Sequence, residues 1–149
     1  EETDFTIYSS NCYVLGFGRV AKILADRLKS LGANVTCVAR KNTDLAWIKA
    51  LGYSAMHIKD LPDNIMYADI VFNTIPALVV GINILDQART DSLFIDLASK
   101  PGGIDFKAAD ELGIRTIHAL SIPGRVAPNS AANYIKDTIY NIIDEMKGS

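Results

Sequence analysis

The sequence predicts an α/β fold in which a doubly wound, mostly parallel sheet of six strands carries helices on both faces. Short apolar runs rich in β-branched residues alternate with segments whose apolar residues recur at helical spacing. Most of these runs are continuously apolar, which indicates strands buried on both faces, as in parallel sheets. A length of 149 residues suits one domain with one sizeable core. We therefore expect a single domain over residues 1–149.

The apolar runs are predicted to be the strands, because a strand, a crossover helix and a parallel strand form the repeating unit of such sheets. No repeat or long linker interrupts the alternation. In chain order the predicted strands cover residues 12–15, 35–39, 55–58, 70–73, 93–97 and 114–118.

Two well-defined helices are predicted between the first three strands. The first has apolar residues at helical spacing from Val20 to Leu31, followed by Gly32, a residue typical of helix C-termini. Asn42 is expected to cap the second helix, which Gly52 ends.

The remaining helices are predicted from weaker signals. Pro62 starts a short third helix, residues 82–88 form a fourth, and Asp105 caps a fifth that ends at Gly113. The last helix is long and carries an apolar stripe across residues 132–146.

Composition indicates a soluble, cytoplasmic protein. A net charge of −2 gives no broad attraction to nucleic acid or to an anionic membrane, so neither partner is expected. No apolar run approaches the roughly 18 residues that span a bilayer, and the first residues are polar and acidic, unlike a signal peptide. Cys12 and Cys37 lie in apolar runs and are expected to be buried, reduced thiols.

A glycine-rich turn follows the first predicted strand. Gly16 and Gly18 would let the backbone turn tightly and approach a pyrophosphate at the helix N-terminus, and Ala21 supplies the small third residue. This pattern predicts a dinucleotide-binding Rossmann fold. The alternative is a plain tight turn between two core elements.

The end of the second strand favours NADP over NAD. NAD sites carry an Asp or Glu there, about 20 residues past the glycines, whereas this chain has Arg40. A guanidinium can bind a 2′-phosphate through charge-assisted hydrogen bonds, Lys41 adds charge, and Asn42 and Thr43 add donors. The alternative is that the two cations are solvated loop residues.

Two later strand ends form the other side of the predicted crevice. Thr74, Ile75 and Pro76 follow the fourth strand and could line the path of the nicotinamide ribose, or could be an ordinary exit turn. Asp96 lies inside an apolar strand before Lys100 and two glycines. These two residues could frame a nicotinamide or an acidic substrate; alternatively, Asp96 is a hydrogen-bonded strand-end carboxylate and Lys100 is solvated.

No catalytic residue and no metal site is predicted. His57 and His118 lie in or beside predicted strands and are expected to be structural. The sequence contains no HExxH, no CxxC and no Ser-His-Asp order.

The chain resembles the C-terminal, nucleotide-binding domain of the A-subunit family of dipicolinate synthase. The resemblance spans about residues 4–146 and rests on the blocks "VLGFGRVA", "GANV", "NTIP", "DLASKPGG" and "PGRVAP", in that order. The chain is also similar to the cofactor domain of D-2-hydroxyacid dehydrogenases. In those enzymes a histidine follows the proline before the last helix, whereas Gly124 follows Pro123 here, and only Lys100 lies near the place of their catalytic arginine.

The resemblance implies a set of cofactor contacts. Gly16, Gly18, Arg19 and Val20 would meet the pyrophosphate, residues 40–42 the 2′-phosphate, and residues 74–76 the nicotinamide side. Other members of the matching blocks complete the predicted cofactor-binding set: Phe17, Leu97 and Ala98.

The resemblance also implies an activity and partners. The family's enzyme works in spores and uses NADP to make dipicolinic acid from an intermediate of the lysine pathway, together with a flavoprotein-like B-subunit. Its N-terminal domain would supply the small-molecule substrate site, so we expect this chain to bind cofactor without turnover, and it could form a homo-oligomer. The alternative function is a regulatory module that senses a nucleotide without catalysis.

Overall fold

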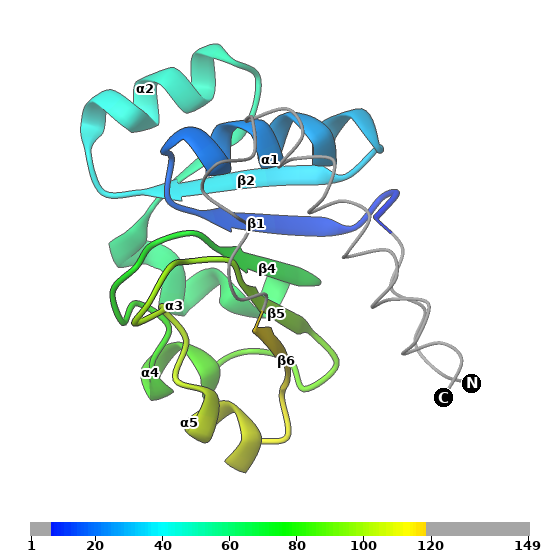
Figure 1. Cartoon of the computed structure of the whole chain (residues 1–149). Coiled ribbons are helices and arrows are strands. Elements are labelled where there is room, and N and C mark those ends of the chain that lie inside the picture. The colour runs from blue at the N-terminus through cyan, green and yellow to red at the C-terminus, as the bar shows by residue number, and fades with distance from the viewer. Residues whose placement is uncertain (1–6, 119–149) are drawn as a thin grey trace.

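The computed structural model describes residues 7–118. Within this range six strands form one sheet. Figure 1 shows how the strands and helices are arranged. Every strand pairs in parallel with its neighbours, in the order β3-β2-β1-β4-β5-β6. This confirms the doubly wound sheet, and all of its described strands are parallel. The strands are β1 (Asn11–Leu15), β2 (Asn34–Ala39), β3 (Ser54–His57), β4 (Ile70–Asn73), β5 (Leu93–Asp96) and β6 (Arg115–His118).

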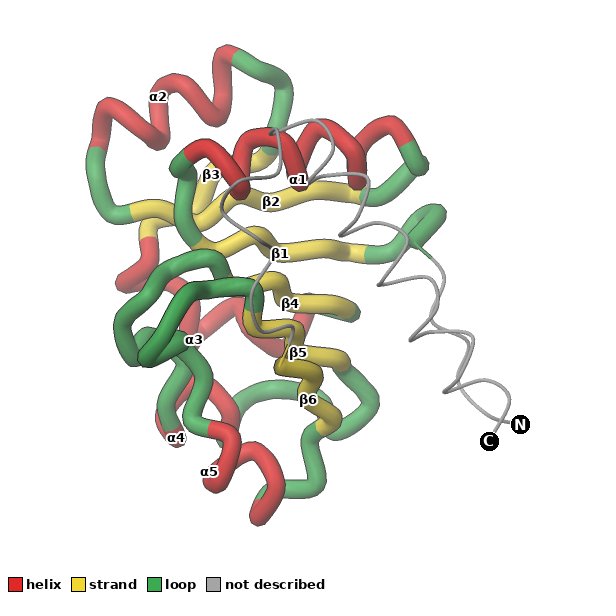
Figure 2. The backbone as a smooth tube through the Cα atoms, viewed as in Figure 1, coloured by secondary structure: helices red, strands yellow, loops and turns green. Residues whose placement is uncertain are grey.

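Helices cover both faces of the sheet (Figure 2). One apolar core lies beneath α1 and α2, and a second core lies between the opposite face and α3, α4 and α5. Short 3₁₀ turns, η1 (Ile58–Asp60) and η2 (Ile65–Tyr67), flank α3. The helices are α1 (Arg19–Ser30), α2 (Asn42–Ala50), α3 (Leu61–Asn64), α4 (Ile82–Leu85) and α5 (Phe106–Glu111).

The central strands are buried because helices cover both of their faces. Every residue of β4 and β5 is buried, and in β1 only the first residue is exposed. Helix α1 packs on this sheet through an apolar stripe of Ala21, Leu24, Ala25 and Leu28. The continuous apolar runs of the sequence thus correspond to strands between two helix layers.

Several predicted helix boundaries differ from those observed. Lys41 rather than Asn42 is the N-cap of α2, and Asn42 is the first helical residue. The N-cap side chain makes no capping hydrogen bond, whereas Asp44 in the first turn interacts favourably with the helix dipole. The prediction that Asp105 caps α5 is confirmed, since its carboxylate accepts a hydrogen bond of 3.0 Å from the backbone N–H of Ala108.

Other boundaries shift by a few residues. Strand β3 ends at His57 because the chain enters η1 there, and α4 spans four residues instead of reaching Ala88. Strand β5 ends at Asp96 and β6 begins at Arg115, one residue from the predicted boundary in each case. The predicted helix over residues 132–146 lies outside the described residues.

Both cysteines are buried and free, as expected. Burial raises the pKa of each thiol, Cys12 and Cys37, to about 12, and for Cys12 the nearby Asp69 carboxylate adds to the effect. The two thiols are therefore protonated parts of the core under α1. Among residues 7–118, no helix is long and apolar enough to cross a membrane.

Candidate dinucleotide-binding site

The order of the strands creates a switch point at the carboxyl ends of β1 and β4. From β1 the sheet grows through β2 and β3 in one direction, whereas β4, β5 and β6 extend it in the other. The loops after β1 and β4 therefore lead to opposite faces of the sheet, as Figure 2 shows. Ligands of open α/β sheets bind in the crevice outside such a switch point.

Gly16, the first glycine of the turn, is required by the protein itself. Its φ of +101° lies in the region that favours glycine. Its N–H donates a hydrogen bond of 2.8 Å to the carbonyl of Val38, and a Cβ at this position would lie 2.5 Å from Oγ1 of Thr74. The turn after β1 thus packs directly on the loop after β4.

Gly18, the second glycine, is not required by any described neighbour. It is the exposed N-cap of α1, with extended backbone, and a Cβ built on it would have no atom of the described residues within 4 Å. As a glycine it offers α1 no capping side chain, and the first turn of α1 contains no acidic residue. The first N–H groups of α1 can therefore bind an anion that approaches Gly18.

Other residues of the turn divide between core and surface. The side chain of Phe17 is 7% exposed and packs in the core, with the Lys22 ammonium 5.3 Å from its ring centre. Arg19 and Val20 are exposed at the start of α1, and Ala21 is fully buried against the sheet. The small third residue of the glycine pattern thus serves helix packing, and Phe17 can offer a ligand only its backbone.

The end of β2 presents positive charge to solvent. Arg40 follows β2 directly, Lys41 and Asn42 begin α2, and all three are exposed. Neither cation forms an ion pair with any residue of the described range, where the recorded pairs join Arg89 to Asp69 and Asp91. The guanidinium of Arg40 and the ammonium of Lys41 are therefore available to an anion at the carboxyl end of β2.

The loop after β4 is anchored by its own side chains. The backbone N–H and the hydroxyl of Thr74 both donate to the carbonyl of Leu15, over 3.0 and 2.7 Å. Ile75 is half-buried and Pro76 is exposed. Because the Thr74 hydroxyl proton is already donated, the hydroxyl can offer a ligand only its acceptor capacity.

Asp96 is a structural carboxylate, which decides between the two roles considered for this residue. Its side chain is fully buried and accepts hydrogen bonds from the backbone N–H groups of Ala98, Gly103 and Ile104 and from the side-chain amide of Asn73. All of these partners belong to the protein, so the carboxylate does not face a substrate.

Asn73, the partner of Asp96, was not predicted from the sequence. It is fully buried at the end of β4 and lies in register with Asp96 on β5. A polar residue closing an apolar strand was the available signal, but its partner depends on strand register. Beyond this pair, Leu97 is half-buried, Ala98 is buried and Lys100 is exposed.

The histidines have structural contacts, as expected. Nδ1 of His57 accepts a hydrogen bond of 3.1 Å from the N–H of Lys59 and thereby caps η1. The ring of His118 packs on Phe106, with 4.7 Å between ring centres.

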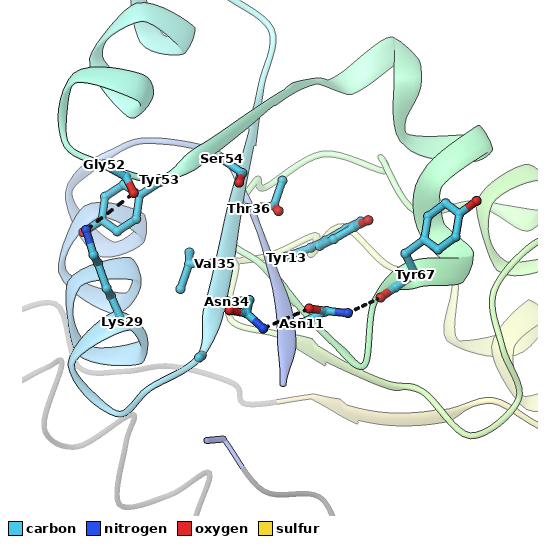
Figure 3. A pocket seen from close by; sticks show the side chains of 11 residues that line it. Asn11, Tyr13, Lys29, Asn34, Val35, Thr36, Gly52, Tyr53, Ser54 and Tyr67 are labelled. Carbon is cyan, nitrogen blue, oxygen red and sulfur yellow. Dashed lines mark hydrogen bonds between the residues drawn. The ribbon is translucent and has the colours of Figure 1, made fainter. Parts of the chain in front are cut away.

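A cavity of about 480 Å³ lies at the amino ends of the strands, opposite the carboxyl ends that form the crevice (Figure 3). The first residues of β1, β2 and β3 line it. Several of its polar groups bond within the protein. The hydroxyl of Tyr13 donates to the carbonyl of Asn64 over 2.7 Å, and the ammonium of Lys29 donates to the carbonyl of Gly52 over 3.4 Å. This cavity is separate from the glycine turn and the crevice at the carboxyl ends.

The sheet order, the glycine turn and the switch point define the class of this protein as a Rossmann-type nucleotide-binding domain. A family model with the description "Putative NAD(P)-binding" matches residues 5–109. The chain belongs to this NAD(P)-binding family.

The chain is also homologous to the A-subunit of dipicolinate synthase. It is 36% identical over 147 residues to the A-subunit of Bacillus subtilis (strain 168), a match that covers 99% of this chain and 50% of that protein. The crystal structure of the A-subunit from Bacillus halodurans is 40% identical, with a TM-score of 0.79 over 95% of this chain and 48% of that one. The chain thus spans about half the length of these relatives.

More distant structures share the fold. A phosphoglycerate oxidoreductase from Vibrio cholerae is 14% identical, with a TM-score of 0.66 over 86% of this chain and 42% of its own. The likeness supports the Rossmann architecture. The family match indicates a nicotinamide cofactor of the NAD(P) type.

Proposed function

We propose that the chain is the NADP-binding domain of an oxidoreductase. The observation that carries the proposal is the pairing of an open helix N-terminus at Gly18 with an exposed Arg40, free of ion pairs to the described residues, at the end of the neighbouring strand β2. An NADP molecule that lies across the carboxyl ends of the strands would place its pyrophosphate at the N-terminus of α1 and its 2′-phosphate at Arg40.

The preference for NADP rests on charge. An acidic residue at this position would accept hydrogen bonds from the ribose hydroxyls of NAD and repel a 2′-phosphate. Arg40 and Lys41 instead offer donors and positive charge, and no described carboxylate competes for them. Asn42, at the start of α2, adds an exposed amide.

The remaining residues take roles according to their place along the crevice. The backbone from Gly16 to Val20 binds the pyrophosphate, and the loops that contain residues 74–76 and residues 97–98 flank the nicotinamide. When bound, the nicotinamide ring exchanges a hydride with a substrate. This chain's own residues bind the cofactor and orient its nicotinamide ring.

The activity we propose is that of the A-subunit of dipicolinate synthase: formation of dipicolinic acid from a lysine-pathway intermediate during sporulation. Support comes from the identity of 36–40% to two such proteins over nearly the whole chain. We further propose that the substrate site lies in the half of those proteins that this chain does not match, and that a flavoprotein-like B-subunit is the partner. The 149-residue chain should bind cofactor without turnover.

The test is a calorimetric titration of the chain with NADPH and NADH. A charge-assisted hydrogen bond of about 1.5 to 3 kcal/mol corresponds to a roughly ten- to hundredfold preference for NADPH. Arg40→Ala should reduce the preference by weakening NADPH, with some selectivity retained through Lys41. Arg40→Asp should reduce it further. The preference should also shrink as salt rises, because Arg40 is exposed.

Lys49→Ala is the matched control, since it removes an exposed positive charge from the last turn of the same helix α2. This variant should keep the NADPH preference of the wild-type chain. Equal affinities of the wild-type chain for NADPH and NADH would overturn the assignment of NADP, and absence of binding to both would overturn the dinucleotide site.

A further inference from the structure

Two fully buried polar side chains face each other at the carboxyl ends of β4 and β5. Asn73 and Asp96 are both 0% exposed, they are paired in strand register, and Nδ2 of Asn73 donates a hydrogen bond of 3.0 Å to Oδ1 of Asp96. Burial of polar groups is costly unless they are fully hydrogen-bonded. The contacts made by the pair therefore show what it stabilises.

Asp96 binds the loop that follows its own strand. Oδ1 also accepts from the N–H of Ala98 over 3.2 Å, and Oδ2 accepts from the N–H groups of Gly103 and Ile104 over 2.8 and 3.3 Å. The carboxylate thus holds both ends of the loop between Ala98 and Gly103. A Cβ on Gly102, whose φ is +82°, would lie 2.8 Å from Oδ2, so the loop folds closely around the carboxylate.

Asn73 binds the loop that follows the neighbouring strand. Its Nδ2 donates to the carbonyl of Ile75 over 2.9 Å, and its Oδ1 accepts from the N–H of the same residue over 3.2 Å. Ile75 in turn packs on the glycine turn, since its Cγ1 lies 3.1 Å from where a Cβ of Gly16 would be. Hydrogen bonds and close packing therefore link Asp96 through Asn73 to the turn after β1.

The two loops also contact each other directly. A Cβ on Gly103 would lie 2.7 Å from the carbonyl oxygen of Ile75, and the carbonyl of Gly103 accepts from the N–H groups of Val79 and Val80 over 3.1 and 2.9 Å. The loops after β4 and β5 thus form one unit with the buried pair at its base.

We infer that Asp96 and Asn73 are positioning residues that set the geometry of the nicotinamide half of the crevice. The inference rests on the proposed function. The pair is fully buried, so its effect on a cofactor would be indirect. It fixes Ile75 and Ala98 in the two flanking loops, and its side-chain hydrogen bonds within the described range join only the pair itself and the loops after β4 and β5. A change in the pair should therefore weaken binding of the nicotinamide half selectively and spare the adenosine half at β2.

The experiment compares two ligands on the 149-residue chain. NADPH spans both halves of the crevice, whereas adenosine 2′,5′-bisphosphate carries only the adenosine half. In Asp96→Asn the new amide places N–H groups against backbone N–H donors, so the loops must rearrange. We expect NADPH affinity to fall at least roughly tenfold and affinity for the bisphosphate to stay within about twofold of wild type.

Two further variants separate positioning from general destabilisation. Asn73→Ala keeps the three backbone bonds to Asp96 but releases Ile75, and should cause the same selective loss; it decides the question if Asp96→Asn does not fold. Asp105→Ala removes one carboxylate bond, to Ala108, at the cap of α5, and should lower the melting temperature without changing the ratio of the two affinities.

The outcomes distinguish the inference from the proposed function. Equal losses for both ligands, or no loss in a folded Asn73→Ala variant, would overturn the positioning role while the cofactor assignment stands. If the wild-type chain binds NADH instead of NADPH, the matching pair of ligands is NADH and AMP, and the same ratio is measured. A wild-type chain that binds no dinucleotide would overturn both.

Discussion

The two halves of the crevice are built in different ways. On the side of β2, the exposed residues Gly18, Arg40 and Lys41 make few contacts with the described part of the protein. On the side of β4 and β5, Asn73 and Asp96 bury their polar groups and bond mainly to backbone. The first half can be changed with little cost in stability, whereas the second half couples ligand geometry to the core.

Removal of the buried carboxylate should produce the largest effect. Asp96→Ala leaves three backbone N–H groups and the Asn73 amide without their acceptor. Loss of a buried charged partner costs about 3–5 kcal/mol, so the free energy of unfolding should fall by this amount in denaturant titrations. Asp105→Ala, which loses a single cap, should cost only about 1 kcal/mol. If Asp96→Ala lost less free energy of unfolding than Asp105→Ala, the β4 and β5 side of the crevice would not be the more tightly coupled to the core.

The two glycines of the turn should separate stability from binding. Gly16→Ala forces a Cβ against Thr74 at a φ of +101°, so it should cost about 1–3 kcal/mol and abolish dinucleotide binding as well. Gly18→Val should cost about 1 kcal/mol or less, as a weaker N-cap, yet block binding because its side chain would fill the approach of the pyrophosphate. Thermal unfolding and NADPH titration of both variants measure this difference; unchanged affinity in folded Gly18→Val would refute the pyrophosphate assignment.

The smallest expected effect is a pH dependence of stability caused by two cysteines in the core beneath α1, on the β2 side of the crevice. Burial raises the pKa of Cys12 and Cys37 to about 12, from 9.0. Because the folded state holds these protons more tightly, their contribution to stability is complete below pH 9 and is lost as pH rises from 9 toward 12. Alkylation at about pH 8 should therefore be slow in the native chain and fast in denaturant. Rapid alkylation of the native chain would show that this half opens readily.

The sequence by itself determined the features that depend on local spacing. Continuous apolar runs predicted the buried parallel strands, and helical periodicity predicted α1 and the apolar stripe by which it packs on the sheet. The order of the elements predicted that Gly16, Gly18 and Arg40 lie at strand ends. Each of these signals lies within a window of a few residues, so it can be recognised before any tertiary contact is known.

Only the tertiary structure decided which distant residues meet. The register of β4 and β5 places Asn73 beside Asp96, which lies 23 residues later in the chain. This contact shows that Asp96, a candidate substrate ligand by sequence, is a structural carboxylate. The need for glycine at position 16 also comes partly from Thr74, which reaches the turn from another strand. The physical reason is that hydrogen bonds across strands depend on register and on the packing of loops, and neither is encoded in the spacing of residues along one element.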